Sequence, residues 1–367
     1  MLSFAAKLLV SFALVYWLLQ KGQIDFSLLL SSLQYKLNWI IGFFMILMNF
    51  FVASYRWKRI LEIKSKSKLS YVSIFKFNWI GCLFNTVLPG IVSGDFIKLL
   101  YVRSIDNSMT KTFLITSVLM DRILGLFGLL CVLGIATIVK YNELIALSPA
   151  VNHLMNINFM IFAAMVLFLI ILFIPTAWQG STFKVTSKIP FLGKQMTKTL
   201  SDFWAIGQSK KNVLYLIFLS MFTQTLNIIV FWTLAQPFFQ YSEVMLAQQN
   251  IITLAHGFTF IPLGFLVIAV PIFPAGIGSG HLAFNYLFSS YGVTNGASLF
   301  NFYLMITIFM NVLGIVPYLT SKRYSKKEIE EFSETTTTTS PSSPSSSSST
   351  PTSATTTTTT TTAPSAS

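Results

Sequence analysis

Charged residues are scarce in this chain. Only 10% of its 367 residues are Asp, Glu, Lys or Arg, whereas 53% are apolar, and soluble domains carry about 25% charged residues. This composition excludes an ordinary soluble globular domain. It favours an all-α integral membrane protein, because a helix satisfies its own backbone hydrogen bonds inside a bilayer.

Several catalytic and cofactor motifs are also missing. His153, His256 and His281 are scattered, without Cys or carboxylates at metal-ligand spacing. The chain has no Walker-type loop and no G-x-S-x-G elbow, and Cys82 and Cys131 lie in apolar stretches that indicate no disulfide framework. We therefore expect no metal, no cofactor and no enzymatic activity, with an intramembrane enzyme left open as an alternative.

Six apolar segments approach the length of about 20 residues that a membrane-crossing helix needs. They cover residues 2–19, 39–55, 112–139, 154–174, 213–235 and 297–320. Loop 56–68, which begins with Arg56, holds six cations against Glu62, and loop 175–212 holds six against Asp202. Because cytoplasmic loops are rich in Lys and Arg, we expect a multi-pass protein of the inner (cytoplasmic) membrane with both termini in the cytoplasm.

Two further apolar regions, 71–101 and 251–291, are interrupted near the middle by Pro and Gly. Treating each as a re-entrant helical hairpin, which leaves the membrane on the side where it began, places every loop on its predicted side. Non-helical backbone at membrane depth is tolerated only inside protein or beside a polar cavity. The interruptions therefore predict an internal polar site.

The two interruptions resemble each other. Pro89, Gly90, Gly94 and Asp95 correspond to Pro274, Gly276, Gly280 and His281, with one residue inserted after Pro274. Each follows two spans and precedes a third, which predicts an inverted-topology repeat of residues 1–139 and 140–323, as in secondary transporters. Similarity of composition alone is the alternative explanation.

Glycines around the second interruption leave backbone N–H groups accessible where a helix begins. Gly276, Gly278, Ser279 and Gly280 lie directly before His281, and a helix N-terminus with free N–H groups attracts anions. This pattern predicts a cradle for a lipid phosphate or another anionic head group. Close helix packing is the alternative use of the same glycines.

Four of the ionisable residues inside apolar segments stand out, because a charge there costs at least about 2.5 kcal/mol. They are Asp95, Lys98, Asp121 and Arg122. We expect Asp95 to pair with Arg122, or Asp121 with Lys98, and the leftover cation to bind a substrate phosphate. A purely structural ion-pair network is the alternative. Asn85, just before the first interruption, completes the candidate substrate-binding set.

The motif series resembles the flippase-like membrane region of lysylphosphatidylglycerol synthases. The resemblance rests on Phe84-Asn85-Thr86-Val87-Leu88-Pro89-Gly90, on Gly94-Asp95, on Asp121-Arg122 and on Pro274 to Gly280, and extends over about residues 1–323. It implies handling of lipids or polyprenyl phosphates, with translocation of aminoacylated phosphatidylglycerol as the best-known activity. We expect a stand-alone member without the soluble aminoacyl transferase domain. Ala275 and His281 depart from the Gly and the acidic residue usual in the family.

The sequence therefore predicts about six transmembrane helices plus two re-entrant hairpins, followed by a disordered cytoplasmic tail at 324–367 that is rich in Thr, Ser and Pro. The leading hypothesis is a lipid translocase for an anionic or phosphate-bearing lipid. The alternative is a non-transporting partner that binds lipid head groups for a separate glycosyltransferase or lipid synthase. No nucleic-acid partner is expected, because the basic residues are confined to short loops.

Overall fold

A computed structural model describes residues 16, 20, 26–87, 93–147, 149–172, 210–247, 251–269 and 276–321. The predicted span 2–19 lies outside these residues except for Tyr16. The same holds for most of loop 175–212 and for the tail 324–367.

The described chain is helical and contains no β-strand. Its helices are α2 (Phe26–Ser32), α3 (Lys36–Leu61), α4 (Tyr71–Val87), α5 (Ser93–Ile105), α6 (Lys111–Val139), α7 (Tyr141–Leu147), α8 (Pro149–Leu172), α11 (Lys210–Ala235), the 3₁₀ turn η1 (Gln236–Phe238), α12 (Glu243–Ala247), α13 (Leu254–Ala269), α14 (Ser279–Ser290), α15 (Gly296–Val312) and α16 (Ile315–Leu319).

Five helical segments within the described residues are long and apolar enough to cross a membrane. They are Lys36–Leu61, Lys111–Val139, Pro149–Leu167, Lys211–Phe238 and Gly296–Leu319. Each overlaps one of the spans expected from hydropathy. One boundary was wrong: the second span does not end before Arg56, because α3 continues to Leu61 and includes Arg56.

The two interrupted regions each form a pair of helices. Helix α4 packs along α5, and α13 packs along α14. The segments that join the members of each pair, 88–92 and 270–275, lie outside the described residues. The first pair extends to Ile105, a few residues beyond the predicted 101.

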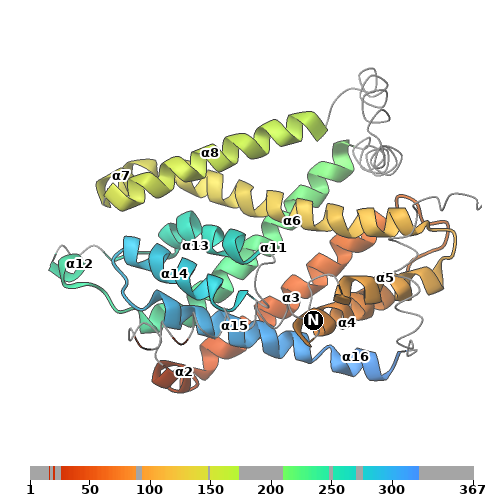
Figure 1. The fold of residues 1–367 in the computed structure, drawn as a ribbon, viewed down its shortest axis with the longest axis horizontal. Helices are drawn as coiled ribbons and strands as arrows, with labels where there is room; N and C mark the ends of the chain where they lie inside the picture. The colour runs from red at the N-terminus through yellow and green to blue at the C-terminus, as the bar shows by residue number, and fades with distance from the viewer. Residues whose placement is uncertain are drawn as a thin grey trace, which may run out of the picture.

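The two helix pairs lie at opposite ends of the molecule (Figure 1). In this view α8 and α6 run along one side and α15 with α16 along the other, while α3 and α11 run obliquely across the molecule, with α11 extending past α6. Helix α13 packs on α6, and α4 packs on α15 and α16. Each pair therefore contacts the long helix that follows the other pair in the sequence.

Small residues allow the first pair to close tightly. A Cβ atom built on Gly94 would lie 2.1 Å from the carbonyl oxygen of Gly81 and 2.6 Å from Oδ1 of Asn85. Only a residue without a side chain permits this approach of α5 to α4. Gly94 therefore serves close helix packing. This packing fixes the start of α5, the helix that carries Asp95.

A second close approach joins α6 to α11. A Cβ atom on Gly128 would lie 2.4 Å from the carbonyl carbon of Ser220, whereas one on Gly125 would meet nothing nearer than 3.5 Å. The two glycines are one helical turn apart on the same helix. They form a matched pair for a packing test.

We predict that Gly128→Ala destabilises the protein by about 1 to 3 kcal/mol, because the added methyl group must push α6 away from the backbone of α11. Gly125→Ala should be close to neutral. Thermal unfolding of both purified variants beside wild type measures the difference. Equal unfolding temperatures for the two variants would contradict the close helix contact.

Asp106 joins the loops at one end of the first pair. Its Oδ2 accepts hydrogen bonds from Oγ of Ser65 (2.9 Å) and from the N–H groups of Lys66 (3.0 Å) and Ser67 (3.2 Å). Its Oδ1 accepts from the hydroxyl and the N–H group of Ser108. These hydrogen bonds, those from Ser108 most of all, hold the pKa of the Asp106 carboxyl far below its usual range.

We expect Asp106→Asn to destabilise the protein by about 1 to 2 kcal/mol, because an amide nitrogen would face donors that need an acceptor. A depressed pKa contributes stability above the unfolded pKa of about 3.9 and loses it as the pH falls through the folded pKa. The gap in unfolding temperature from wild type should therefore stay constant from about pH 5 to 8 and shrink below about pH 4. Glu243→Gln, at an exposed carboxylate, is the control. A gap that widens on acidification would show that Asp106 is not held as an anion.

Candidate functional site

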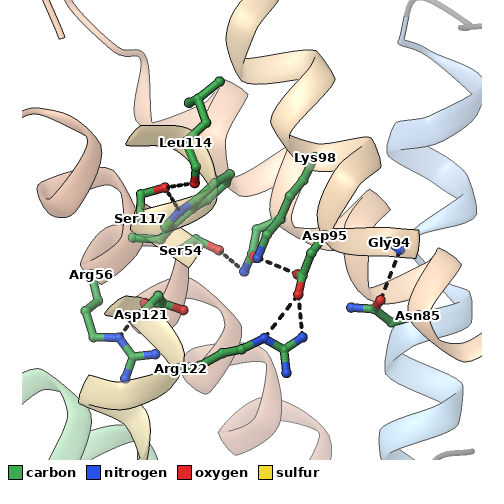
Figure 2. A network of polar contacts seen from close by, with 12 residues as sticks. Ser54, Arg56, Asn85, Gly94, Asp95, Lys98, Leu114, Ser117, Asp121 and Arg122 are labelled. Atoms are coloured by element: carbon green, nitrogen blue, oxygen red, sulfur yellow. Dashed lines mark hydrogen bonds and ion pairs between the residues drawn. The ribbon is translucent and has the colours of Figure 1, made fainter. Parts of the chain in front are cut away.

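Asp95 lies in the first turn of α5 and is bonded by two cations, one on each carboxylate oxygen. Nζ of Lys98 is 3.0 Å from Oδ1. Nε of Arg122 is 3.1 Å from Oδ2, and Nη2 of Arg122 also donates to Oδ2. Figure 2 shows Arg122 on α6 pointing toward Asp95 and Lys98 approaching the same carboxylate from its own helix. Of the two pairings expected from the sequence, Asp95 with Arg122 is present.

Lys98 is enclosed on its other sides. Its ammonium lies 4.6 Å from the ring centroid of Trp57 and 3.5 Å from Oδ1 of Asn78. Nδ2 of Asn78 donates to Oγ of Ser54 (3.0 Å), and Nε1 of Trp57 donates to Oγ of Ser117 (3.3 Å). Lys98 is therefore a fixed, buried counter-charge of Asp95, in contact with residues of α3 and α4.

Arg122 differs from Lys98 in exposure: 47% of its side chain is accessible, against 8% for Lys98. It lies eleven residues into α6, or about 16 Å along the helix from Lys111. Its accessible side lines a cavity of about 310 Å³. The guanidinium thus contacts the buried carboxylate and also faces open space.

The cavity joins the two halves of the chain. The helices α4 and α6 of the first half supply the cation of the cavity and some of its polar groups. Helices α13 and α15 and the turn before α14 supply mainly apolar side chains, together with further hydroxyl and amide groups. The lining residues are Asn85, Thr86, Arg122, Ile268, Ala269, Gly276, Phe300, Tyr303, Leu304, Thr307, Ile308 and Asn311. A cavity with one cationic wall and one apolar wall suits a ligand that has an anionic part and a hydrocarbon part.

Asn85 and Asn311 hold the polar edge of this cavity in place. Oδ1 of Asn85 accepts the N–H group of Gly94 (3.1 Å), which fixes the beginning of α5 against α4. Nδ2 of Asn311 donates to Oγ1 of Thr86 (2.9 Å), which links α15 to α4. The polar lining is therefore positioned by one bond within the first half and one bond between the two halves.

Asp121 does not belong to this cavity. It forms an ion pair with Nε of Arg56 (2.8 Å), and Nη1 of Arg56 donates to Oγ of Ser220 (2.8 Å). Arg56 is buried in α3, so its assignment to an exposed basic loop was wrong. The pairing of Asp121 with Lys98 is not found, because adjacent residues on α6 point in different directions and Asp121 faces α3 and α11.

Amide side chains extend this contact between helices. Nε2 of Gln224 donates to the carbonyl of Gly125 (3.1 Å), and Nδ2 of Asn227 donates to Oε1 of Gln224 (3.3 Å). Nδ2 of Asn49 donates in turn to Oδ1 of Asn227 (2.7 Å). Intramembrane amides commonly join helices in this way, and these link α3, α11 and α6.

The second pair contains a neutral counterpart of the Asp95 bond. Nδ1 of His281 accepts the N–H group of Gly278 (3.3 Å), so its Nε2 is the protonated nitrogen that donates to Oδ1 of Asn301 (2.9 Å). Gly276 and Gly278 adopt positive φ angles of 71° and 89°, which only glycine adopts easily. His281 is buried, and these two bonds engage both nitrogens of its ring.

The structure brings together some of the predicted site residues and separates others. Asn85, Arg122 and Gly276 line the cavity, and Gly94, Asp95 and Lys98 lie behind Arg122. Four residues of the second pair follow Gly276 but are not part of the lining: Gly278, Ser279, Gly280 and His281. Pro89, Gly90 and Pro274 lie outside the described residues.

The sequence hypothesis missed the contribution of α15. Thr307 and Asn311 line the cavity, and both are polar residues in an apolar span, which marks candidates for function. The aromatic and aliphatic lining residues carry no comparable signal, because such residues fill every span. Within the part of the chain that the structure describes, no group of three or more His, Cys, Asp or Glu residues is placed to hold a metal ion.

Comparison with known families gives a match over most of the chain. The family described as the lysylphosphatidylglycerol synthase TM region matches residues 4–317. No curated protein and no solved structure matches the chain. The family match confirms the resemblance found in the motif series.

We predict that Asp121→Asn destabilises the protein by about 3 kcal/mol, because it leaves the buried guanidinium of Arg56 without its counter-ion. The double variant Arg56→Met/Asp121→Asn should recover part of this loss, since it removes the uncompensated charge. Thermal unfolding of the two variants measures both effects. A double variant less stable than Asp121→Asn would show that the pair is not a simple structural link.

Proposed function

The chain belongs to the family of the lysylphosphatidylglycerol synthase transmembrane region, and from this membership we propose that it is a membrane lipid translocase. Its substrate would be an anionic or phosphate-bearing lipid, such as aminoacylated phosphatidylglycerol or a polyprenyl-phosphate-linked lipid. One observation carries the proposal: a half-exposed arginine faces an amphipathic cavity between the two helix pairs.

The chemistry of the cavity supports a phosphate ligand. A guanidinium offers several N–H donors to phosphate oxygens, and the hydroxyl and amide groups of Thr86, Thr307 and Asn311 lie in the same cavity. Ile268, Phe300 and Ile308 supply apolar surface for the adjoining hydrocarbon. Among the described lining residues there is no carboxylate, histidine or cysteine, which favours binding and transport over catalysis.

The arrangement also supports an inverted-topology repeat with two re-entrant hairpins. Asp95 and His281 are each the third residue of the second helix in their pair, and each bonds to the long helix that follows, through Arg122 or Asn301. In the proposed topology six spans and two hairpins leave both termini in the cytoplasm, and the protein lies in the inner membrane. Transporters of this kind bind their substrate where broken helices meet near the midplane.

A second candidate is a protein that binds the head group without moving it. The cavity of about 310 Å³ has room for a head group, and holding a lipid there would serve a separate glycosyltransferase or lipid synthase. This alternative uses the same residues. The two candidates differ only in whether the lipid crosses the bilayer.

We predict that proteoliposomes containing the protein transfer labelled phosphatidylglycerol, its lysyl form or a polyprenyl phosphate faster than empty vesicles. Arg122→Ala should slow the transfer of that lipid by about tenfold or more, because a charge-assisted hydrogen bond to the phosphate is lost. Arg59→Ala, the same change on a partly exposed arginine of α3 that pairs with Glu62, is the matched control. Each variant is compared at equal reconstituted amount after its folding is verified.

Two results would count against translocation. If no lipid moves faster than in empty vesicles, the head-group-binding partner becomes the better explanation. If Arg122→Ala moves lipid at the wild-type rate, the cavity is not the translocation site.

A further inference from the structure

We infer that a phosphodiester with one negative charge binds by taking Arg122 from Asp95, while Lys98 keeps the carboxylate neutralised. The inference rests on the proposed function, because the phosphodiester is taken to be that of a membrane lipid. It adds a role for Lys98, which does not line the cavity, and it specifies the charge of the ligand.

The geometry allows the two cations to act separately. Lys98 bonds to Oδ1 of Asp95, and Arg122 bonds only to Oδ2. When Arg122 turns to a ligand, the bond from Lys98 to Oδ1 is not disturbed. If one cation bonded to both carboxylate oxygens, the two cations could not act separately.

Burial decides which of the two cations exchanges its partner. Asp95 and Lys98 have side chains only 9% and 8% exposed, whereas Arg122 is 47% exposed and faces the cavity. Lys98 is also held by the Trp57 ring and by Asn78. A ligand therefore reaches Arg122 and does not reach Lys98.

The charges at the site give the ligand's charge. Lys98 and Arg122 carry two positive charges and Asp95 carries one negative charge, which leaves one positive charge uncompensated. Asp121 does not change this balance, because Arg56 neutralises it. A single phosphodiester charge completes the site, whereas a pyrophosphate brings more negative charge than the site can neutralise.

Lys98 lowers the electrostatic free energy that the exchange of Arg122 from Asp95 to the ligand requires. A buried carboxylate that loses its only cation is strongly destabilised, so without Lys98 the bond from Asp95 would hold Arg122 against any ligand. The exchange would also break an ion pair between α5 and α6. Because α5 packs chiefly on α4, ligand binding would loosen the first helix pair from α6.

Isothermal titration calorimetry tests this inference by measuring how dioctanoyl phosphatidylglycerol binds to the full-length protein in detergent. We expect Lys98→Met to weaken binding by about tenfold or more, because the site then has no net charge. The double variant Asp95→Asn/Lys98→Met restores one net positive charge and should bind within about threefold of wild type. Lys58→Met, at a lysine of α3 that pairs with Glu62, is the matched control and should bind as wild type does.

Wild-type affinity in Lys98→Met would overturn the inference, and so would a double variant that binds as weakly as Arg122→Gln. If Lys98→Met does not yield folded protein, the double variant decides alone by the same comparison with Arg122→Gln. Soluble glycerophosphoglycerol, which lacks acyl chains, separates the lipid from a free head group. Equal binding of both probes would overturn the lipid as the ligand.

Failure of this inference can be distinguished from failure of the proposed function. Binding that follows the charge order, together with no lipid transfer in proteoliposomes, would support the exchange and contradict translocation. Lipid transfer with Lys98→Met binding as wild type does would support translocation and contradict the exchange.

Discussion

The structure around the site depends on one constraint, that a carboxylate enclosed between helices has to be neutralised by cations. Asp95 meets it with two, and the neighbouring features follow from this arrangement. Gly81 and Gly94 let α5 approach α4 closely enough to enclose the carboxylate, and Trp57 covers the ammonium of Lys98. Arg122 completes the neutralisation from α6. The local packing of α3, α4, α5 and α6 is thus arranged around a single buried negative charge.

The two halves of the chain differ at the position that is Asp95 in the first half and His281 in the second. In the second pair the bond to the following helix joins His281 to Asn301, so that half needs no counter-charge. The cationic wall of the cavity therefore comes from the first half, while Ile268 and Phe300 of the second half are apolar. The cation of the described lining and its aliphatic side chains thus come from different halves of the chain, and this makes the cavity amphipathic.

Hydropathy predicted the long helices of the described chain, and the Pro-Gly interruptions predicted the two helix pairs, because both signals are local. The rare charges likewise indicated that Asp95 and Arg122 belong together. Arg56 was misassigned because a cluster of cations follows it in the sequence, and hydropathy cannot tell a helical arginine that turns inward from one in a loop. Its partner Asp121 lies on another helix. The apolar lining from α13 and α15 carries no sequence signal that distinguishes it from ordinary span residues.

The nature of the cavity wall also bears on which phosphate lipids fit the proposed exchange. An aminoacylated phosphatidylglycerol carries cationic amino groups besides its phosphodiester, and a buried cation needs an anion or several acceptors. The described lining offers hydroxyl and amide oxygens but no carboxylate, and Asp95 stays bonded to Lys98. A phosphodiester whose remaining head group is uncharged therefore leaves no charge uncompensated in this cavity. Among the lipids that the family membership suggests, the site as built favours the one that carries a single negative charge and nothing else.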